Sequence, residues 1–320
     1  MRNARNKAGV VETSLGFSVC RPVTRCMKLF LAALLLCGCV MQSVPDAGRT
    51  RDGHNTKPDY ELVWADEFDQ EVCPSPRNWT NEKGFVRNHE LQWYQPENAF
   101  CKDGMLVLQA RREQRRNPAF DAQSDRWKKN REFIEYTSAS LKTQGLWSWR
   151  YGRFEMRARI RTDPGLWPVF WTLGTQGDWP AFGEIDILES YRGLLLANAA
   201  WGGDGKGLPS WNITQRPVAG LGDNWVEEFH VWRMDWSEQS IELYVDDRLL
   251  NAIALESTGN AQGIEPRNPF HHPHYLLLSL AVGGHKGGDP SATEFPANFE
   301  IDYVRVYQRP LADSGLTGRP

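Results

Sequence analysis

The sequence predicts an all-β fold, a sandwich or jelly roll of two curved antiparallel sheets. In Tyr151–Arg161, apolar residues alternate with charged ones, which is the pattern of a strand with one buried face and one solvent-facing side. Similar runs recur along the chain, Gly- and Pro-rich turns separate them, and no helical periodicity or strand–helix–strand rhythm interrupts them. These observations favour a sandwich built from many short strands.

The expected strands follow one another from Tyr60 onward. After Tyr151–Arg161 come four further alternating runs: Phe229–Trp236, Ile241–Val245, Tyr275–Val282 and Phe299–Tyr307. Turn clusters lie at Asp163–Gly165, Gly202–Gly205 and Gly287–Pro290. Because the chain shows no internal repeat, we predict a single folded domain over residues 58–310, followed by a tail over residues 311–320.

The composition excludes several classes of protein. Hydrophobic residues make up 41% of the 320 residues and charged residues 24%, which suits a buried core and excludes a disordered chain or a polytopic membrane protein. The net charge of -3 argues against a nucleic-acid partner. The 14 Trp residues suit a surface that stacks on flat apolar faces of a ligand, although Trp also fills cores.

The N-terminal region has the pattern of a targeting segment. Leu29–Leu36 is an apolar run far shorter than the ~20 residues of a membrane-spanning helix, and it has the size of the hydrophobic part of a signal peptide. Leu36-Cys37-Gly38-Cys39 resembles a bacterial lipobox, so we predict that Cys39 carries lipid; an ordinary cleaved signal, with Cys39 incidental, is the alternative. These assignments give a signal over residues 1–38 with translation starting at Met27, a flexible tether over residues 39–57, and a lipid-anchored protein of the bacterial cell envelope.

Two cysteines, Cys73 and Cys101, fall within the predicted domain. An oxidising compartment permits a disulfide between them. Two buried free thiols are the alternative, and the sequence leaves both open.

The chemistry is concentrated in Gly183–Glu189, which reads G-E-I-D-I-L-E. Three carboxylates within six residues are costly on a buried strand, because like charges and desolvation both disfavour ionisation. On a regular strand Glu184 and Asp186 share one face, whereas Glu189 has the wrong parity. A one-residue β-bulge near Ile187-Leu188 would turn Glu189 toward the other two, so the pattern predicts a bulge beside a catalytic site.

Two kinds of chemistry fit three convergent carboxyl groups. On a concave sheet, Glu184 and Glu189 could approach the roughly 5–5.5 Å separation of a retaining glycosidase pair. Asp186 between them could share a proton with the nucleophile and keep the pKa of the acid raised. A three-carboxylate metal site is the alternative. It is less favoured, because the motif contains no His and alternate carboxylates on one strand rarely supply a full Ca²⁺ shell.

The motif resembles the E-x-D-x-x-E signature of glycoside hydrolase family 16 in its bulged form, and further segments in the family's order extend the resemblance from Leu62 to Gln308. The resemblance is to the laminarinase-like, endo-β-glucanase type. The other matching segments are Leu62–Phe68, Asn88–Tyr94, Tyr151–Glu155, Gly165–Pro168 with Phe170-Trp171, Trp179-Pro180, Phe229-His230, Leu280–Gly284 and Asp302–Tyr307.

The resemblance implies a concanavalin A-like jelly roll whose concave sheet carries a cleft. It implies hydrolysis of internal β-linkages in a polysaccharide with retention and without a catalytic cofactor. Glu184 would be the nucleophile, Asp186 its helper and Glu189 the general acid/base. Trp179 would stack on a sugar near the cleavage point, and Asn88 and Glu90 are candidate hydroxyl-binding residues, although Glu90 could instead be a strand-end charge.

Other positions carry alternatives or departures from the family. Trp167 and Trp171 share one face and would line either the cleft or the core, and Trp201 would add an aromatic platform. The family often carries a calcium ion on the convex side, held mostly by backbone atoms, and the resemblance would assign it to Glu67, Gly104 and Asp302. Ser140 stands where many laminarinase-like members have Arg, and Asn198–Trp201 replaces a strand that often contains His.

These departures leave the mechanism in place and bear on the substrate. We predict a monomer that acts on a β-1,3- or mixed-linkage β-1,3-1,4-glucan. The enzyme alternative is a hydrolase of β-galactans, including agar-like or mucin-type galactosides. The non-enzyme alternative is a sugar-binding protein on the same fold, which would have no need for three clustered carboxylates.

Overall fold

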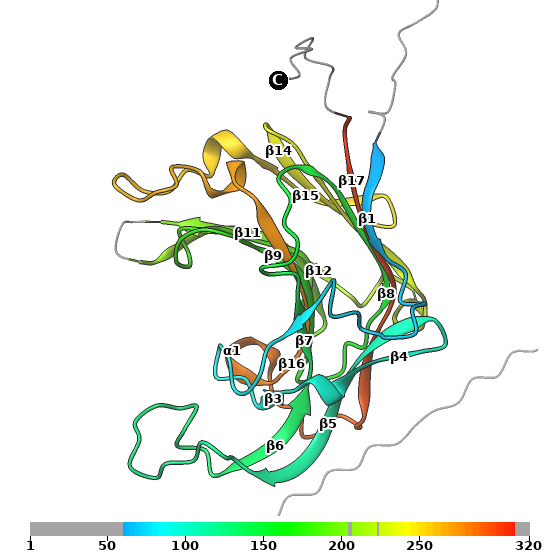
Figure 1. Cartoon of the computed structure of the whole chain (residues 1–320), viewed down its shortest axis with the longest axis vertical. Coiled ribbons are helices and arrows are strands. Elements are labelled where there is room, and N and C mark those ends of the chain that lie inside the picture. Colours follow the sequence, from blue (N-terminus) through cyan, green and yellow to red (C-terminus); the bar gives the residue numbers. More distant parts are fainter. Residues whose placement is uncertain (1–59, 204–206, 223, 311–320) are drawn as a thin grey trace, which may run out of the picture. The chain divides into compact units, whose positions relative to one another are not determined.

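The computed structural model describes residues 60–203, 207–222 and 224–310, which form two layers of antiparallel sheet (Figure 1). The predicted all-β sandwich is thereby confirmed. The predicted signal (1–38), the lipidated Cys39, the tether up to residue 57 and the tail from residue 311 lie outside the described residues. Within them, no helix is long and apolar enough to cross a membrane.

The first sheet has seven strands, with the acidic motif on the central part of the sheet. Its order is β12-β11-β10-β9-β16-β7-β2, and all of its pairings are antiparallel. The strands are β12 (Pro209–Pro217), β11 (Leu194–Gly202), β10 (Glu184–Tyr191), β9 (Leu166–Gly174), β16 (His274–Val282), β7 (Ser140–Lys142) and β2 (Thr80–Asn81).

The second sheet has the order β15-β14-β13-β8-β17-β5-β6-β3, with β1 paired to β17 and β4 paired to β5. The pairing of β3 with β6 is parallel. The strands are β15 (Arg248–Ala254), β14 (Ser240–Val245), β13 (His230–Trp236), β8 (Gly152–Arg159), β17 (Ala297–Gln308), β5 (Met105–Arg116), β6 (Phe133–Ser138), β3 (Gln92–Tyr94), β1 (Glu61–Asp66) and β4 (Ala99–Lys102). The short helices are η1 (Pro96–Asn98), η2 (Trp225–Glu227), η3 (Leu255–Ser257), η4 (Pro269–His271) and α1 (Gly284–Gly287).

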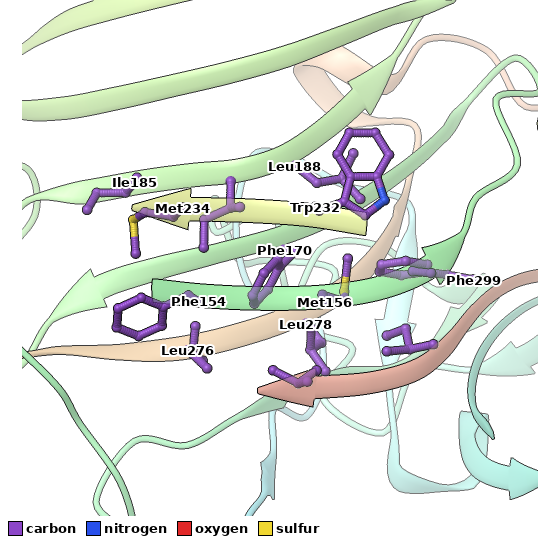
Figure 2. Close-up of a cluster of buried hydrophobic side chains, with 14 of the residues drawn as sticks. Phe154, Met156, Phe170, Ile185, Leu188, Trp232, Met234, Leu276, Leu278 and Phe299 are labelled. Carbon is purple, nitrogen blue, oxygen red and sulfur yellow. The ribbon is translucent and has the colours of Figure 1, made fainter. Parts of the chain in front are cut away.

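The core lies between the two sheets and is built from the inward side chains of both. Along β8, buried and half-buried residues alternate, as the sequence predicts, and Phe154 and Met156 are fully buried. Figure 2 shows them facing Phe170 and Leu278 of the other sheet. The four other predicted runs form β13, β14, β16 and β17. Burial of so many large apolar side chains is the main favourable term in the stability of the sandwich.

The two domain cysteines are joined. Cys73, in the loop after β1, forms a disulfide with Cys101 on β4, with their Cα atoms 5.5 Å apart. This resolves the alternative between a disulfide and two free thiols in favour of the disulfide.

Candidate active site

The acidic motif forms β10, and the predicted bulge in it is confirmed. In the pairing of β10 with β11, the register shifts between Asp186 and Glu189. In its pairing with β9, the register shifts between Asp186 and Leu188. Ile187 and Leu188 are both fully buried in the core as a result. The extra residue restores the parity of Glu189, so that Glu184, Asp186 and Glu189 all line the same side of the sheet.

These three carboxyl groups lie in a cleft of about 600 Å³ on the outer face of the seven-stranded sheet. Other lining residues come from β3, β9, β10, β11, β12, β16 and α1 and from the loops after β2 and β9. They include Arg87, Asn88, Glu90, Tyr94, Trp167, Trp171, Trp179, Tyr191, Asn198, Trp211, Ile213, Ser279 and Lys286. The size and the mixture of aromatic and polar groups are typical of a carbohydrate-sized ligand site.

Each of the three carboxyl groups has a defined hydrogen-bond partner. The indole N–H of Trp179 donates to Oε2 of Glu184 at 2.6 Å, and the indole N–H of Trp167 donates to Oε1 of Glu189 at 2.9 Å. The side-chain amide of Asn198 donates to Oε2 of Glu189 at 2.9 Å and to Oδ2 of Asp186 at 3.3 Å. The carboxyl groups are therefore held in place before a substrate arrives.

Burial raises the pKa of all three carboxyl groups, but the neighbouring charges and hydrogen bonds change each pKa differently. The pKa of Asp186 lies well above its ordinary value because of burial and the charges of Glu184 and Glu189. The pKa of Glu189 rises to about 8, through burial and the charge of Glu184. Burial also raises the pKa of Glu184, but hydrogen bonds from Trp179 and Asp186 and the charge of Arg87 oppose the rise.

This division favours an ionised Glu184 beside protonated Asp186 and Glu189. Asp186, carrying its proton, can donate a hydrogen bond to Glu184, which stabilises the Glu184 carboxylate. A carboxylate next to an acid with a pKa near neutrality is the arrangement that double-displacement glycoside hydrolysis requires.

The predicted binding residues Asn88 and Glu90 also lie in the cleft. Glu90 is buried and accepts hydrogen bonds from the amide groups of Gln92 at 2.7 Å and Asn88 at 3.3 Å. Tyr94 donates to the same carboxyl group at 3.4 Å. The Glu90 carboxylate is thus a fixed acceptor in the cleft wall rather than an exposed strand-end charge.

Whether each predicted tryptophan lines the cleft depends on which face of its strand it occupies. Trp167 and Trp171 alternate on β9 and both line the cleft, so the cleft interpretation holds for them. Trp201 does not line the cleft, and the prediction that it forms a platform there is wrong. It is an odd number of residues from Asn198 on β11, so it turns to the opposite face and packs edge-on against Phe270, with ring centroids 6.3 Å apart.

The predicted calcium ligands do not fit a metal site through their side chains. Both carboxylate oxygens of Glu67 accept hydrogen bonds from Arg305, at 2.7 and 2.8 Å, and Asp302 accepts one from Arg157 at 2.6 Å. Gly104 lies in the turn between β4 and β5 with a φ of +73°. Among the described residues, no cluster of three or more His, Cys, Asp or Glu side chains could hold a metal ion.

Several cleft residues were not found from the sequence. Arg87 precedes the segment that contains Asn88 and Glu90, and Lys286 follows a Gly-rich strand end. Trp211 and Ile213 are exposed at 40% and 53% on β12 and alternate along it. A strand with two apolar residues on its solvent-facing side is a signal that could have identified this part of the cleft.

Comparisons with known proteins agree with this geometry. The family model described as glycosyl hydrolases family 16 matches residues 85–305. A β-glucanase of Rhodothermus marinus is 36% identical over 309 residues, which cover 87% of this chain and 93% of that protein. Glucan endo-1,3-β-glucosidase A1 of Niallia circulans is 31% identical over 273 residues. The matched part covers 77% of this chain and 38% of that protein. A solved structure reported with endo-acting O-glycanases of the human gut microbiota that initiate mucin breakdown is 34% identical, with a TM-score of 0.70 over 78% of this chain and 91% of that one.

Proposed function

The chain belongs to glycosyl hydrolase family 16, and we propose that it cleaves internal linkages of a β-1,3- or mixed-linkage β-1,3-1,4-glucan. It is a glycoside hydrolase of the retaining type, as its sequence motifs imply. The observation that carries the proposal is the bulged strand β10, which brings Glu184 and Glu189 to one side of a cleft with Asp186 between them.

The reaction follows from the protonation states of these groups. The Glu184 carboxylate attacks the anomeric carbon while Glu189 donates its proton to the leaving glycosidic oxygen, which gives a covalent glycosyl-enzyme and a shortened chain. Glu189, now a base, takes a proton from water, and the water oxygen displaces Glu184 with net retention. Asp186 hydrogen-bonds Glu184 and takes no part in bond making. No step needs a cofactor.

A β-galactoside is the second candidate substrate. It is supported by the similarity to the structure reported with mucin O-glycanases, and by Asn198, which contacts two of the three acidic residues in a strand where family members often carry His. A screen of the purified protein on laminarin, lichenan, agarose and mucin glycans separates the candidates. Reducing ends released from laminarin or lichenan support the glucan, and release from agarose or mucin glycans alone overturns it.

For the location, the proposal is a lipid anchor at Cys39 in a bacterial cell envelope. Its support is the sequence around Cys39, where a small residue and a cysteine follow an apolar run of signal-peptide size. Expression of the full chain in a bacterium with labelled palmitate tests this. The wild type is expected to incorporate label and to fractionate with membranes, and Cys39→Ser to do neither. An unlabelled, wholly soluble wild type would contradict the anchor.

A further inference from the structure

Arg87 is a cleft residue that the mechanism above does not use. It lies in the loop between β2 and β3, and its guanidinium lies over the ring of Trp171, 5.0 Å from the ring centroid. It forms an ion pair with Glu82. Arg87 and Glu184 line the same cleft, and the charge of Arg87 opposes the rise in the pKa of Glu184 that burial causes. The contact with Trp171 places Arg87 on the β9 side of the cleft.

Most of the hydrogen-bonding capacity of Arg87 is unused. A guanidinium carries five N–H donors in a planar fork. Within the part of the chain that the structure describes, only Nη2 has an acceptor, the Oε2 atom of Glu82. The side chain of Arg87 is 24% exposed, and it lines the cleft. The remaining donors are available to a ligand lying in the cleft.

Glu82, which holds Arg87, is itself held by Ser140 on β7. The backbone N–H of Glu82 donates to the carbonyl oxygen of Ser140 at 3.0 Å. The Ser140 hydroxyl donates to Oε2 of Glu82 at 2.8 Å, so the same carboxylate oxygen accepts from Ser140 and Arg87. An arginine at position 140 would remove this hydroxyl and bring a second guanidinium to the same carboxylate.

The charges around Arg87 favour an uncharged ligand. Glu82 pairs with Arg87, Glu90 and Glu184 line the same cleft, and the charges of Glu82 and Glu90 raise the pKa of Arg87. These carboxylates already compensate the positive charge, and they would repel a sulfate or carboxylate brought next to it. Sugar hydroxyls can accept from the guanidinium without that penalty.

We propose that Arg87 is a substrate-binding residue that donates hydrogen bonds to the hydroxyl groups of a neutral sugar on the β9 side of Glu184, and that Ser140 sets its position through Glu82. The proposal rests on the proposed function, since it places a sugar of the substrate in this cleft. It adds a specificity residue that acts on binding and takes no part in bond making.

The test compares kcat and KM of the wild type, Arg87→Met and Arg87→Lys on the best neutral polymer of the substrate screen. Arg87→Met is expected to lower kcat/KM roughly 10- to 100-fold, the range for lost hydrogen bonds from a charged donor, with most of the change in KM. Arg87→Lys keeps the positive charge but loses the planar set of guanidinium donors, so its KM should lie between those of the wild type and Arg87→Met. Ser140→Ala should raise KM several-fold while leaving kcat near the wild-type value.

Arg153→Met is the matched control. Arg153 also pairs with a carboxylate, Asp235, and also lies 5.0 Å from an aromatic centroid, that of Tyr60, but it belongs to the other sheet. The kcat/KM of Arg153→Met, measured per folded molecule, should stay at the wild-type value. A wild-type KM for Arg87→Met, or an equal rise in KM for Arg153→Met, would overturn the proposal.

Direct binding separates this proposal from the proposed function. Calorimetry measures laminarihexaose and its sulfated form against Glu184→Gln, with and without Arg87→Met. Loss of laminarihexaose affinity with Arg87→Met supports the role of Arg87 even if the wild type hydrolyses no polymer in the screen, which would count against the proposed function alone. Tighter binding of the sulfated sugar that depends on Arg87 would contradict a neutral subsite.

Discussion

The Glu189→Gln variant is expected to be more stable than the wild type at neutral pH, although it loses hydrolysis. Burial and the charge of Glu184 raise the pKa of Glu189 from 4.5 to about 8. Glutamine has nearly the same volume and its carbonyl oxygen can still accept from the indole of Trp167. At neutral pH wild-type Glu189 must take up a proton to be buried, and glutamine is neutral in both the folded and the unfolded state, so the substitution removes that cost while the packing around the side chain is kept.

The size of the effect follows from the two pKa values. A carboxyl group with a higher pKa in the folded state binds its proton more tightly there, so stability is lost as pH rises from the unfolded to the folded value. For Glu189 that window runs from 4.5 to about 8. At pH 7 the cost is at most roughly 3 kcal/mol, from 1.36 kcal/mol per unit of pKa. Glu189→Gln should remove it, which is on the order of 5–10 °C in Tm for a domain of this size.

Scanning calorimetry of the wild type and Glu189→Gln at pH 5, 6, 7 and 8 measures this. The difference in Tm should be small at pH 5 and should widen in favour of the variant toward pH 8. Glu256→Gln, at an exposed position in η3, serves as the control and should show no such widening. A Tm difference that does not change with pH, or a wild type that is the more stable protein at pH 8, would refute the reasoning.

Two further predictions concern partners of the catalytic groups. Trp179→Ala should raise KM and lower kcat, because the indole N–H donates a hydrogen bond to Glu184 at 2.6 Å. The change in Tm should be small, because the Trp179 side chain is 45% exposed. A large fall in Tm with unchanged kcat/KM would assign Trp179 to the core instead. Asn198→Ala removes a hydrogen bond that favours ionised Glu189, so the alkaline limb of the kcat/KM profile should move to higher pH. An alkaline limb that stays in place or moves to lower pH would show that Asn198 does not tune the acid.

The strand periodicity and the acidic motif were sufficient to predict the part of the site that lies on one strand. Glu189 has the wrong parity for a regular strand, and only a bulge reconciles it with Glu184, so the local geometry could be worked out from spacing alone. The same reasoning applied to β11 excludes Trp201 from the cleft, because it lies three positions after Asn198 and so faces the opposite side of the strand.

What the sequence does not predict is which distant segments meet. Arg87 reaches the cleft through Glu82 and Ser140, and Ser140 is more than fifty positions away along the chain. The carboxylate of Glu67 is neutralised by Arg305 from a strand near the other end of the domain. Such pairings depend on the sheet order, which places β1 beside β17 and β2 beside β7. The local pattern of residues along one strand contains no information about the order of strands in the sheet.

The most direct test of the account is the stereochemistry of azide rescue on an activated aryl β-glycoside of the best substrate. With Glu184→Ala, azide should take the place of the missing nucleophile and give the inverted α-glycosyl azide. With Glu189→Ala, the glycosyl-enzyme still forms from the activated substrate, and azide should release the retained β-glycosyl azide. Products with the opposite configurations would reverse the two roles, and full hydrolysis by either variant without azide would contradict the assignment of Glu184 and Glu189 as the catalytic pair.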